Sequence, residues 1–316
     1  MTRPGRARGF EEPLQVALVN NMPDAAVEAT EAQFSRLLRR AAPGAALHLR
    51  RYGLASATRS ETARRQMARS HEDVAALYAR GADLLIVTGT EPRAERLESE
   101  PFFDDMARLV DWARGNTLGA VWSCLAAHVA VLAMDGLQRR RAAEKFSGIY
   151  RCEIIGDWAF EGAGATILAP HSRYNGLARE ELESRGYHVA SFSREVGVDC
   201  FWRREPSLFL FAQGHPEYDA DTLAREFRRD ALRFAGGRGA RFPPPPANYF
   251  SQATCGALAE LALRAADLGP RGFAPRLDRI LAQERPKAGW GGDAGLLYRN
   301  WLNTATAAKK RDLRSA

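Results

Sequence analysis

The feature that most constrains the fold is an alternation of short apolar runs with longer amphipathic stretches in the first half of the chain. Apolar runs fall at 16–19, 84–87 and 118–122, and helical periodicity at 31–41, about 60–81 and 102–114. A short, continuous apolar run is typical of a strand buried on both faces of a parallel sheet. Strands alternating with helices in this way predict an α/β fold, a mostly parallel sheet with helices on both faces.

After Gly148 the pattern changes to short strands with few helices between them. These strands are predicted at 152–155, 166–168, 188–192, 198–202 and 208–211, and they indicate an antiparallel extension of the sheet. A helix is predicted from Thr222 to Phe234, with Asp219 as its N-cap. The last part of the chain, about 249–316, is predicted to be a helical segment whose Leu297 and Trp301 pack on the core.

The chain of 316 residues is interpreted as one domain over 13–316, preceded by a mobile arm at 1–12. That arm carries arginines but no apolar core, so it is not expected to be a signal peptide. No apolar run approaches the length of a membrane span, so no membrane partner is predicted. The cysteines are scattered without a disulfide framework, which favours a reducing, cytoplasmic location.

The formal net charge of +7 is spread along the chain rather than gathered in one segment. Nucleic-acid binding is possible on that charge alone. The sequence, however, contains no recognition-helix or RNP-type motif, so solvated basic faces are the favoured interpretation and no nucleic acid is predicted. No grouping of His, Cys, Asp and Glu has metal-ligand spacing, so no metal is predicted. A glycine-rich phosphate loop is also missing, and no bound cofactor is expected.

Cys124 is the candidate nucleophile, because the apolar run 118–122 gives way there to a helical pattern. A strand entering a helix places the cysteine on a sharp turn, where free N–H groups and the helix dipole favour a thiolate. His215 and Glu217 follow the run 208–211 and would point to the same side if the backbone stays extended. The three residues predict a nucleophile, its base and a carboxylate that orients the base.

Other assignments of these residue types are weaker. A buried structural cysteine with an unrelated histidine is the plain alternative. A serine hydrolase centred on His171 and Ser172 is disfavoured, because the chain has no Gly-x-Ser-x-Gly turn. His128 lies one turn into the predicted helix and is expected to pack there rather than act in catalysis. By the geometry of the turn, the backbone N–H of Leu125 is the predicted oxyanion donor.

An ordered series of stretches carries a family resemblance over most of the chain. They are Val19–Pro23 with Thr30–Phe34, Ile86–Gly89, the turn at Cys124, Glu144–Tyr150, Ala169–Tyr174, Gly214–Asp219 and Arg299–Asn303. Each stretch is weak by itself, but the series is specific. The chain resembles the homoserine O-acyltransferase (homoserine O-succinyltransferase) family, which is built on the class I glutamine-amidotransferase fold.

The resemblance implies transfer of a succinyl group from succinyl-CoA to homoserine, a step toward methionine, by a homodimeric enzyme. It also implies roles for individual residues. Gly89 would contribute to the oxyanion site, and Lys145 and Ser172 would lie in the substrate pocket. Arg229 has the spacing of the arginine that binds the acceptor carboxylate, and Arg93 falls at or near the position that selects the acyl group.

The chain departs from the family pattern in three places. A lysine usually follows Pro23, but residues 24–29 contain none. Arg93 stands in an altered loop, and the residues around Cys124 differ from the usual turn, with His128 in place of glutamine. Because of these departures, two alternatives stay open: acetyl-CoA as the donor, or another hydroxy amino acid as the acceptor. An amidase or hydrolase of the same fold, or a non-catalytic binding protein, also stays open.

Overall fold

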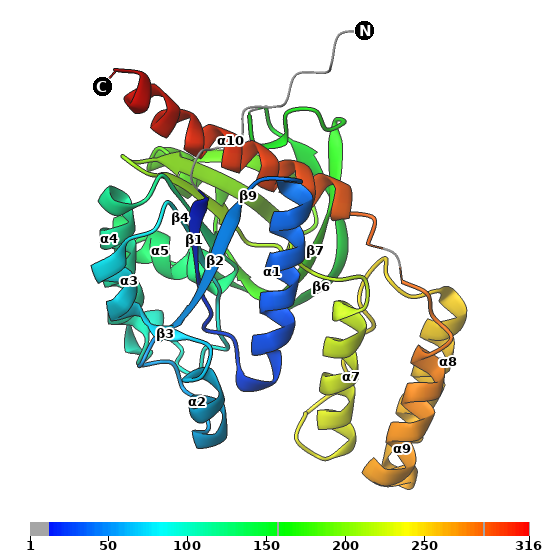
Figure 1. Ribbon diagram of the computed structural model, residues 1–316. Helices are drawn as coiled ribbons and strands as arrows, with labels where there is room; N and C mark the ends of the chain where they lie inside the picture. Colours follow the sequence, from blue (N-terminus) through cyan, green and yellow to red (C-terminus); the bar gives the residue numbers. More distant parts are fainter. Residues whose placement is uncertain (1–12, 157, 287, 316) are drawn as a thin grey trace, which may run out of the picture.

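The structure, a computed structural model, describes residues 13–156, 158–286 and 288–315, with side chains up to residue 307. The N-terminal arm predicted for 1–12 lies outside these residues. One ten-stranded mixed sheet runs through the molecule (Figure 1). Its strands are β1 (Leu14–Val19), β2 (Leu47–Gly53), β3 (Glu72–Asp73), β4 (Leu84–Val87), β5 (Gly119–Ser123), β6 (Arg140–Ile154), β7 (Thr166–Gly176), β8 (His188–Ser193), β9 (Gly197–Arg204) and β10 (Leu208–Ala212).

The sheet divides into a parallel and an antiparallel part, in the order β3-β2-β1-β4-β5-β10-β9-β8-β6-β7. All pairs from β3 to β10 are parallel, and those from β10 to β7 are antiparallel. Every residue of β4, β5 and β10 is buried, as expected for strands covered on both faces. The predicted α/β class and its antiparallel extension are confirmed, although β6 and β7 are much longer than predicted.

Helices cover both faces of the sheet (Figure 1). They are α1 (Val27–Ala41), α2 (Glu61–Met67), α3 (Val74–Arg80), α4 (Phe103–Asn116), α5 (Leu125–Asp135), α6 (Arg179–Ser184), α7 (Thr222–Ala235), α8 (Gln252–Leu263), α9 (Ala265–Leu281) and α10 (Gly291–Ser315). Short 3-10 helices are η1 (Asp24–Ala26), η2 (Leu97–Ser99) and η3 (Trp158–Phe160). Helices α1 and α10 pack against one face, whereas α3, α4 and α5 pack against the other. Leu297 and Trp301 are buried in α10, as predicted.

Two local predictions are wrong. The helix predicted over 60–81 is broken, because His71 leaves the helical path to contact Glu31 (Nε2 to Oε1, 2.5 Å) and β3 follows. Asp73 then starts α3 by accepting a hydrogen bond from the N–H of Ala75. Asp219 is not the N-cap of α7, since Asp221 holds that position and the Asp219 carboxylate pairs with Arg36.

The helices α7, α8 and α9 enclose an apolar cluster of their own, away from the sheet (Figure 1). Phe227, Leu258 and Phe273 lie at its centre. Helix α7 follows the segment that carries His215, so this group of helices is connected to the candidate site through α7. No helix of the described residues is long and apolar enough to cross a membrane.

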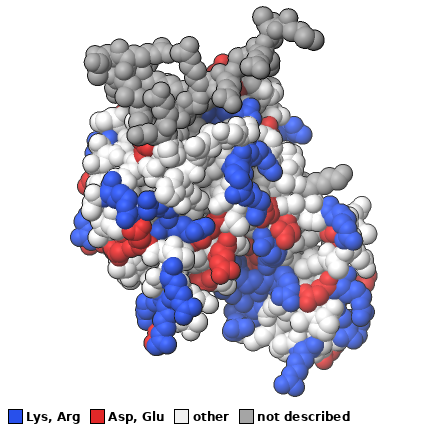
Figure 2. All heavy atoms as spheres, in the orientation of Figure 1, with Lys and Arg blue, Asp and Glu red and all other residues white. Residues whose placement is uncertain are grey.

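Charged side chains of both signs are interspersed over the face shown in Figure 2. Many exposed arginines of the described residues are paired, as Arg36 is with Asp219 and Arg228 with Asp278. Such mixing is expected of solvated faces, the interpretation that the sequence favoured.

Candidate active site

Cys124 occupies a sharp turn between β5 and α5, as the sequence predicted. Its φ of 52° and ψ of −113° are rare for a residue other than glycine, and it is the N-cap residue of α5. Strained backbone of this kind is concentrated at functional sites. The Cys124 N–H donates to the carbonyl of Ala212 at the end of β10 (2.7 Å). Cys124 and Cys255 are partly exposed, whereas Cys152 and Cys200 are buried, so Cys124 is the accessible thiol of the sheet.

His215 and Glu217 are in contact, but not for the reason that the sequence suggested. His215 Nδ1 lies 2.7 Å from Glu217 Oε1. The backbone is not extended there, because the N–H of Tyr218 donates to the carbonyl of His215 (3.1 Å) and closes a turn. The turn, rather than strand alternation, brings the two side chains together. The N–H of His215 donates to the carbonyl of Pro170 (2.8 Å), which anchors the segment on β7.

The electrostatics of His215 favour the imidazolium. Burial alone would lower its pKa, but the charges of Glu217 and Cys124, together with hydrogen bonds to both, raise the pKa well above its ordinary value. Because Nδ1 is directed to Glu217, Nε2 is the nitrogen left to exchange a proton with the thiol. The protonation of His215 is therefore coupled to both Cys124 and Glu217.

Gly89 and Leu125 lie against each other at the carboxyl ends of the neighbouring strands β4 and β5. A Cβ built on Gly89 would be 2.9 Å from the backbone nitrogen of Leu125. Only glycine permits this close approach. The two predicted oxyanion residues are thus brought together next to Cys124, at the edge of a parallel sheet where ligands characteristically bind.

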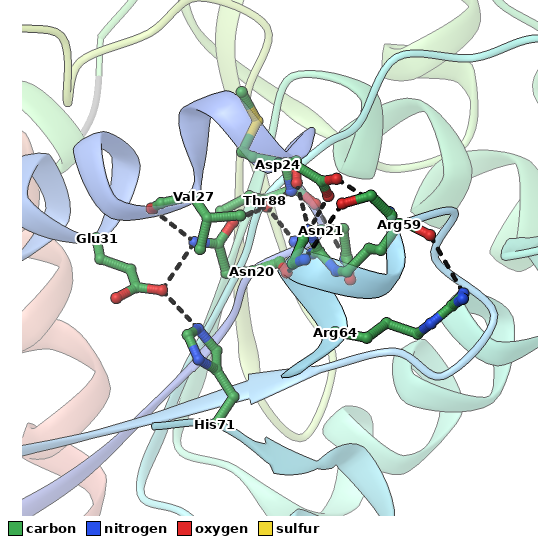
Figure 3. A network of polar contacts seen from close by, with 12 residues as sticks. Asn20, Asn21, Asp24, Val27, Glu31, Arg59, Arg64, His71 and Thr88 are labelled. Atoms are coloured by element: carbon green, nitrogen blue, oxygen red, sulfur yellow. Dashed lines mark hydrogen bonds and ion pairs between the residues drawn. The ribbon is translucent and has the colours of Figure 1, made fainter. Parts of the chain in front are cut away.

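A polar network fixes the loop that carries Gly89 (Figure 3). The N–H of Asn21 donates to Thr88 Oγ1 (2.8 Å), and its side-chain amide to the Thr88 carbonyl (3.3 Å). Asn20 in turn donates to the Val27 carbonyl and to Glu31. The Val19–Pro23 stretch therefore supports the residue before Gly89, a role that the sequence did not reveal.

A cation from the segment between β2 and α2 packs against the loop that lacks the family's lysine. The buried side chain of Arg59 donates to the carbonyls of Asn20 (2.7 Å) and Met22 (2.9 Å) (Figure 3). It also lies 3.6 Å from Asp24. Burial lowers the pKa of Arg59, and Asp24 opposes that shift. Because its donors are turned to the backbone, Arg59 holds the loop in place.

The predicted pocket residue Ser172 is linked to His215 through Glu226 and Tyr218. Its hydroxyl donates to Glu226 of α7, and the Tyr218 hydroxyl donates to the same carboxylate (2.7 Å). The Tyr218 ring stacks on the His215 imidazole, with 4.2 Å between centroids. Glu226 is thus connected to His215 through one aromatic ring. Sequence reasoning missed it, although its position three residues before Arg229 places both on one helical face.

Lys145 and Arg229 are brought together by a shared acid. Lys145 Nζ lies 3.3 Å and Arg229 Nε 2.9 Å from the carboxylate of Asp230. Burial alone would raise the pKa of Asp230, but the two cations lower it. Arg229 also lies 3.9 Å from Glu91, in the loop after Gly89, so this charged cluster spans the gap between α7 and that loop.

Arg93 is exposed, and its backbone rather than its side chain is anchored. The N–H groups of Arg93 and Ala94 both donate to the buried carboxylate of Glu100. The Arg93 side chain is therefore presented to solvent from a fixed backbone in the loop after β4. Its role in selecting the acyl group stays a prediction.

A second buried histidine lies next to the catalytic segment. His171 Nε2 is 3.2 Å from Asp199, and Arg173 Nε donates to His171 Nδ1 (3.1 Å). Cys152, His171 and Asp199 bring potential metal-ligand atoms within 4.8 Å of one another. Because Nδ1 accepts from Arg173, the neutral ring carries its proton on Nε2, toward Asp199, and offers no lone pair to a cation there. The buried guanidinium already supplies the positive charge, so this group does not fit a metal.

These elements define an α/β protein with a glutamine amidotransferase-like fold, in which Cys124 is the candidate nucleophile. Similar solved structures are a glutamine amidotransferase from Methylobacillus flagellatus (16% identity, 92% of this chain and 94% of that one, TM-score 0.52) and one from Thermotoga maritima (12%, 93% and 99%, TM-score 0.50). At these identities the likeness shows the fold alone.

The chain belongs to the homoserine O-succinyltransferase family, whose pattern it matches over residues 5–311. It is 43% identical to a homoserine O-succinyltransferase of Bradyrhizobium japonicum, over 94% of this chain and 92% of that protein. It is 42% identical to the one of Rhodopseudomonas palustris, over 92% and 87%. The family resemblance found in the sequence is confirmed, and the protein is a transferase.

Proposed function

We propose that this protein transfers the succinyl group of succinyl-CoA to the hydroxyl of L-homoserine through an acyl-Cys124 intermediate. The observation that carries the proposal is Cys124 on its strained turn, coupled to the hydrogen-bonded pair His215–Glu217. Family membership favours this activity over the amidase and binding-protein alternatives. The homodimer and the cytoplasmic location stay predictions.

Two steps complete the transfer. The Cys124 thiolate attacks the thioester carbonyl, the bond to the coenzyme A sulfur breaks, and His215 donates its proton to the departing thiolate. The homoserine hydroxyl then attacks the acyl-cysteine as His215 takes its proton, and Cys124 leaves as the thiolate. Glu217 holds the histidine tautomer throughout. The N–H groups of Leu125 and Gly89 receive the oxyanion in both steps.

The acceptor is a zwitterion, so each of its charges needs a partner. Arg229 suits the carboxylate, because its planar guanidinium can bind both oxygens. Glu226 suits the ammonium, because its carboxylate lies beside Ser172 and is linked through Tyr218 to the base. Lys145 balances Asp230, leaving Arg229 the cation that an incoming carboxylate can recruit.

The test is a paired assay on the wild-type protein. Thiol release from succinyl-CoA that depends on homoserine is measured beside ammonia release from glutamine. An acyl adduct on the Cys124 peptide, found by mass spectrometry when homoserine is omitted, supports the two-step route. Ammonia release without homoserine-dependent thiol release, or an adduct on another cysteine, contradicts it.

Arg93 bears on the choice of donor. Succinyl differs from acetyl by a carboxylate, which is costly to desolvate without a cation. If Arg93 meets that carboxylate, Arg93→Ala should reduce the preference for succinyl-CoA over acetyl-CoA by on the order of a hundredfold in kcat/KM. Arg96→Ala is the matched control, since Arg96 is an exposed arginine paired with Glu98 in the same loop. An unchanged donor ratio in Arg93→Ala removes Arg93 from the acyl site.

A further inference from the structure

Beyond the ladder of the paired strands β5 and β10, two further hydrogen bonds tie together the segments that carry the nucleophile and the base. The first is the hydrogen bond from the Cys124 N–H to the Ala212 carbonyl (2.7 Å). The second lies one helical turn further on, where His128 Nε2 is 2.9 Å from the side-chain oxygen of Gln213. Gln213 is two residues before His215, and His128 is four residues after Cys124.

The side-chain amide of Gln213 has only one orientation that fits its surroundings. Its Nε2 donates to the Val198 carbonyl (2.7 Å), and its Oε1 accepts from the Leu177 N–H (3.0 Å). Oε1 is therefore an acceptor toward His128 as well, and the His128 ring must carry its proton on Nε2. His128 Nδ1 is then a bare acceptor.

His128 is an unusual side chain for its position. It is 3% exposed, and its Nδ1 has no hydrogen-bond partner among the described residues. Burial, with a contribution from nearby Arg173, lowers its pKa to about 3, so the ring is neutral at physiological pH. An apolar side chain would fill this core position without leaving a buried nitrogen unpaired. The imidazole therefore does not serve packing alone.

We propose that the His128–Gln213 hydrogen bond is a positioning element that sets the separation of the Cys124 thiol and the His215 imidazole. With the hydrogen bond at Cys124 alone, the first turn of α5 could rotate about that bond, and the rotation would displace the thiol. A second bond one turn along the helix removes that freedom, because Gln213 is itself bonded to β9 and to the start of the segment after β7. His128 and Gln213 act through Cys124 and His215 and need not touch substrate.

Three variants separate positioning from packing. His128→Leu removes the donor and keeps the core apolar, and His128→Gln keeps a donor that can reach Gln213. Val131→Ala, at a buried position of the same helix that makes no side-chain bond to Gln213, removes packing and keeps the tie. All are made in a Cys255→Ser background, so that Cys124 is the one partly exposed cysteine left among the described residues.

The measurement is the rate of Cys124 alkylation by iodoacetamide from pH 5.5 to 9.5, with kcat for succinyl transfer and the Tm of each variant. We expect His128→Leu to be alkylated at least tenfold more slowly near pH 6.5, to approach the parent rate near pH 9.5, and to keep its Tm while kcat falls tenfold or more. His128→Gln should stay within about threefold of the parent at every pH. Val131→Ala should lower Tm and leave the pH profile unchanged.

The inference rests on the Cys124–His215 pair of the proposed function, and the two can fail separately. If the parent itself shows no enhanced alkylation at low pH, the proposed pair is wrong. If the parent shows it and His128→Leu retains the same profile and kcat, the positioning role is wrong. A loss of activity in His128→Leu that is accompanied by a Tm loss like that of Val131→Ala also overturns it.

Discussion

Two buried imidazole–carboxylate pairs lie next to each other in this molecule, and their protonation is opposite. His215 pairs with Glu217, and Glu217 and Cys124 raise the pKa of His215 well above its ordinary value despite burial. His171 faces Asp199, yet burial, with help from Arg173, lowers its pKa. Burial outweighs the partner carboxylate at His171, whereas Glu217, followed by Cys124, outweighs burial at His215. The balance between burial and the neighbouring charges therefore decides which histidine holds a proton.

The two pairs also meet physically. A Cβ on Gly214 would lie 2.4 Å from Asp199 Oδ1 and 3.1 Å from His171 Cε1, so the segment that carries His215 rests directly on the His171–Asp199 pair. Because the charge of Arg173 balances that of Asp199, His171 adds no net charge behind the base. We propose that His215–Glu217 is a reactive pair and that His171–Asp199 is a supporting pair.

The largest expected difference in kcat is between variants of two cysteines, one beside each pair. Cys124→Ser should lower kcat for succinyl transfer by on the order of a thousandfold or more, because an alcohol with no appreciable ionised fraction is a poor nucleophile here. Cys152→Ser, beside His171, should leave kcat nearly unchanged. Burial raises the pKa of the Cys152 thiol, which keeps it protonated. Full activity in Cys124→Ser would end the assignment of a reactive pair.

The two carboxylates should separate catalysis from stability. Glu217→Gln should lower kcat by about 10²-fold, since it orients the base without moving the proton itself. Asp199→Asn should chiefly lower the free energy of unfolding, by about 3 kcal/mol, because it leaves the buried Arg173 charge uncompensated. Urea unfolding and steady-state kinetics on both variants measure this. The comparison fails if Asp199→Asn lowers kcat more than Glu217→Gln does while the free energy of unfolding of Asp199→Asn stays at the wild-type value.

The sequence predicted the reactive pair better than the supporting one, for a physical reason. Cys124 is marked by a local switch from strand to helix, and His215 and Glu217 are two residues apart, so short segments carry the signal. His171 and Asp199 belong to different strands and meet only when β7 and β9 are assembled in the sheet. Long-range contacts of this kind have no local periodicity, and the sequence therefore indicated neither the pair nor its arginine.

The same distinction explains which parts of the fold were predicted. The continuous apolar strands β4 and β10 are recognisable because both faces are buried. The helix predicted over 60–81 was wrong because one contact, His71 with Glu31, breaks it. The predicted contact between Glu217 and His215 is present, but the predicted cause is wrong, since a turn rather than an extended strand directs Glu217 to His215. Tertiary contacts override local pattern at each of these points.

A third buried histidine gives a pH-dependent prediction with a definite sign. The pKa of His128 is lowered from 6.5 to about 3, so the unfolded chain binds its proton below about pH 6.5 and the native state does not. The stability that the neutral ring contributes is present above pH 6.5 and is lost as the pH falls toward 3. Between pH 7 and pH 5 the wild type should lose about 2 kcal/mol relative to His128→Gln.

Urea unfolding of both proteins at the two pH values measures this difference. His215 should behave in the opposite sense: because its pKa is raised, its contribution is present below about pH 6.5 and is lost as the pH rises through the folded-state value. Equal pH dependence of the wild type and His128→Gln would mean that His128 is not held neutral in the native state.

The smallest expected effect concerns a serine that touches only the supporting pair. Ser191 Oγ donates to Asp199 Oδ2 (2.7 Å) and accepts from the Cys200 N–H (3.1 Å). Ser191→Ala should cost about 1–2 kcal/mol of unfolding free energy, because it leaves a buried carboxylate oxygen and a backbone donor short of a partner. It should change kcat by less than about twofold. The lost energy is about that of one hydrogen bond, and Ser191 makes no hydrogen bond to the reacting atoms. Ser193→Ala is the matched control, as the Ser193 hydroxyl is also buried but serves only the turn at Glu195. If Ser191→Ala lowers kcat as strongly as Glu217→Gln while Ser193→Ala does not, the two pairs are one catalytic unit and the division between reactive and supporting pairs is wrong.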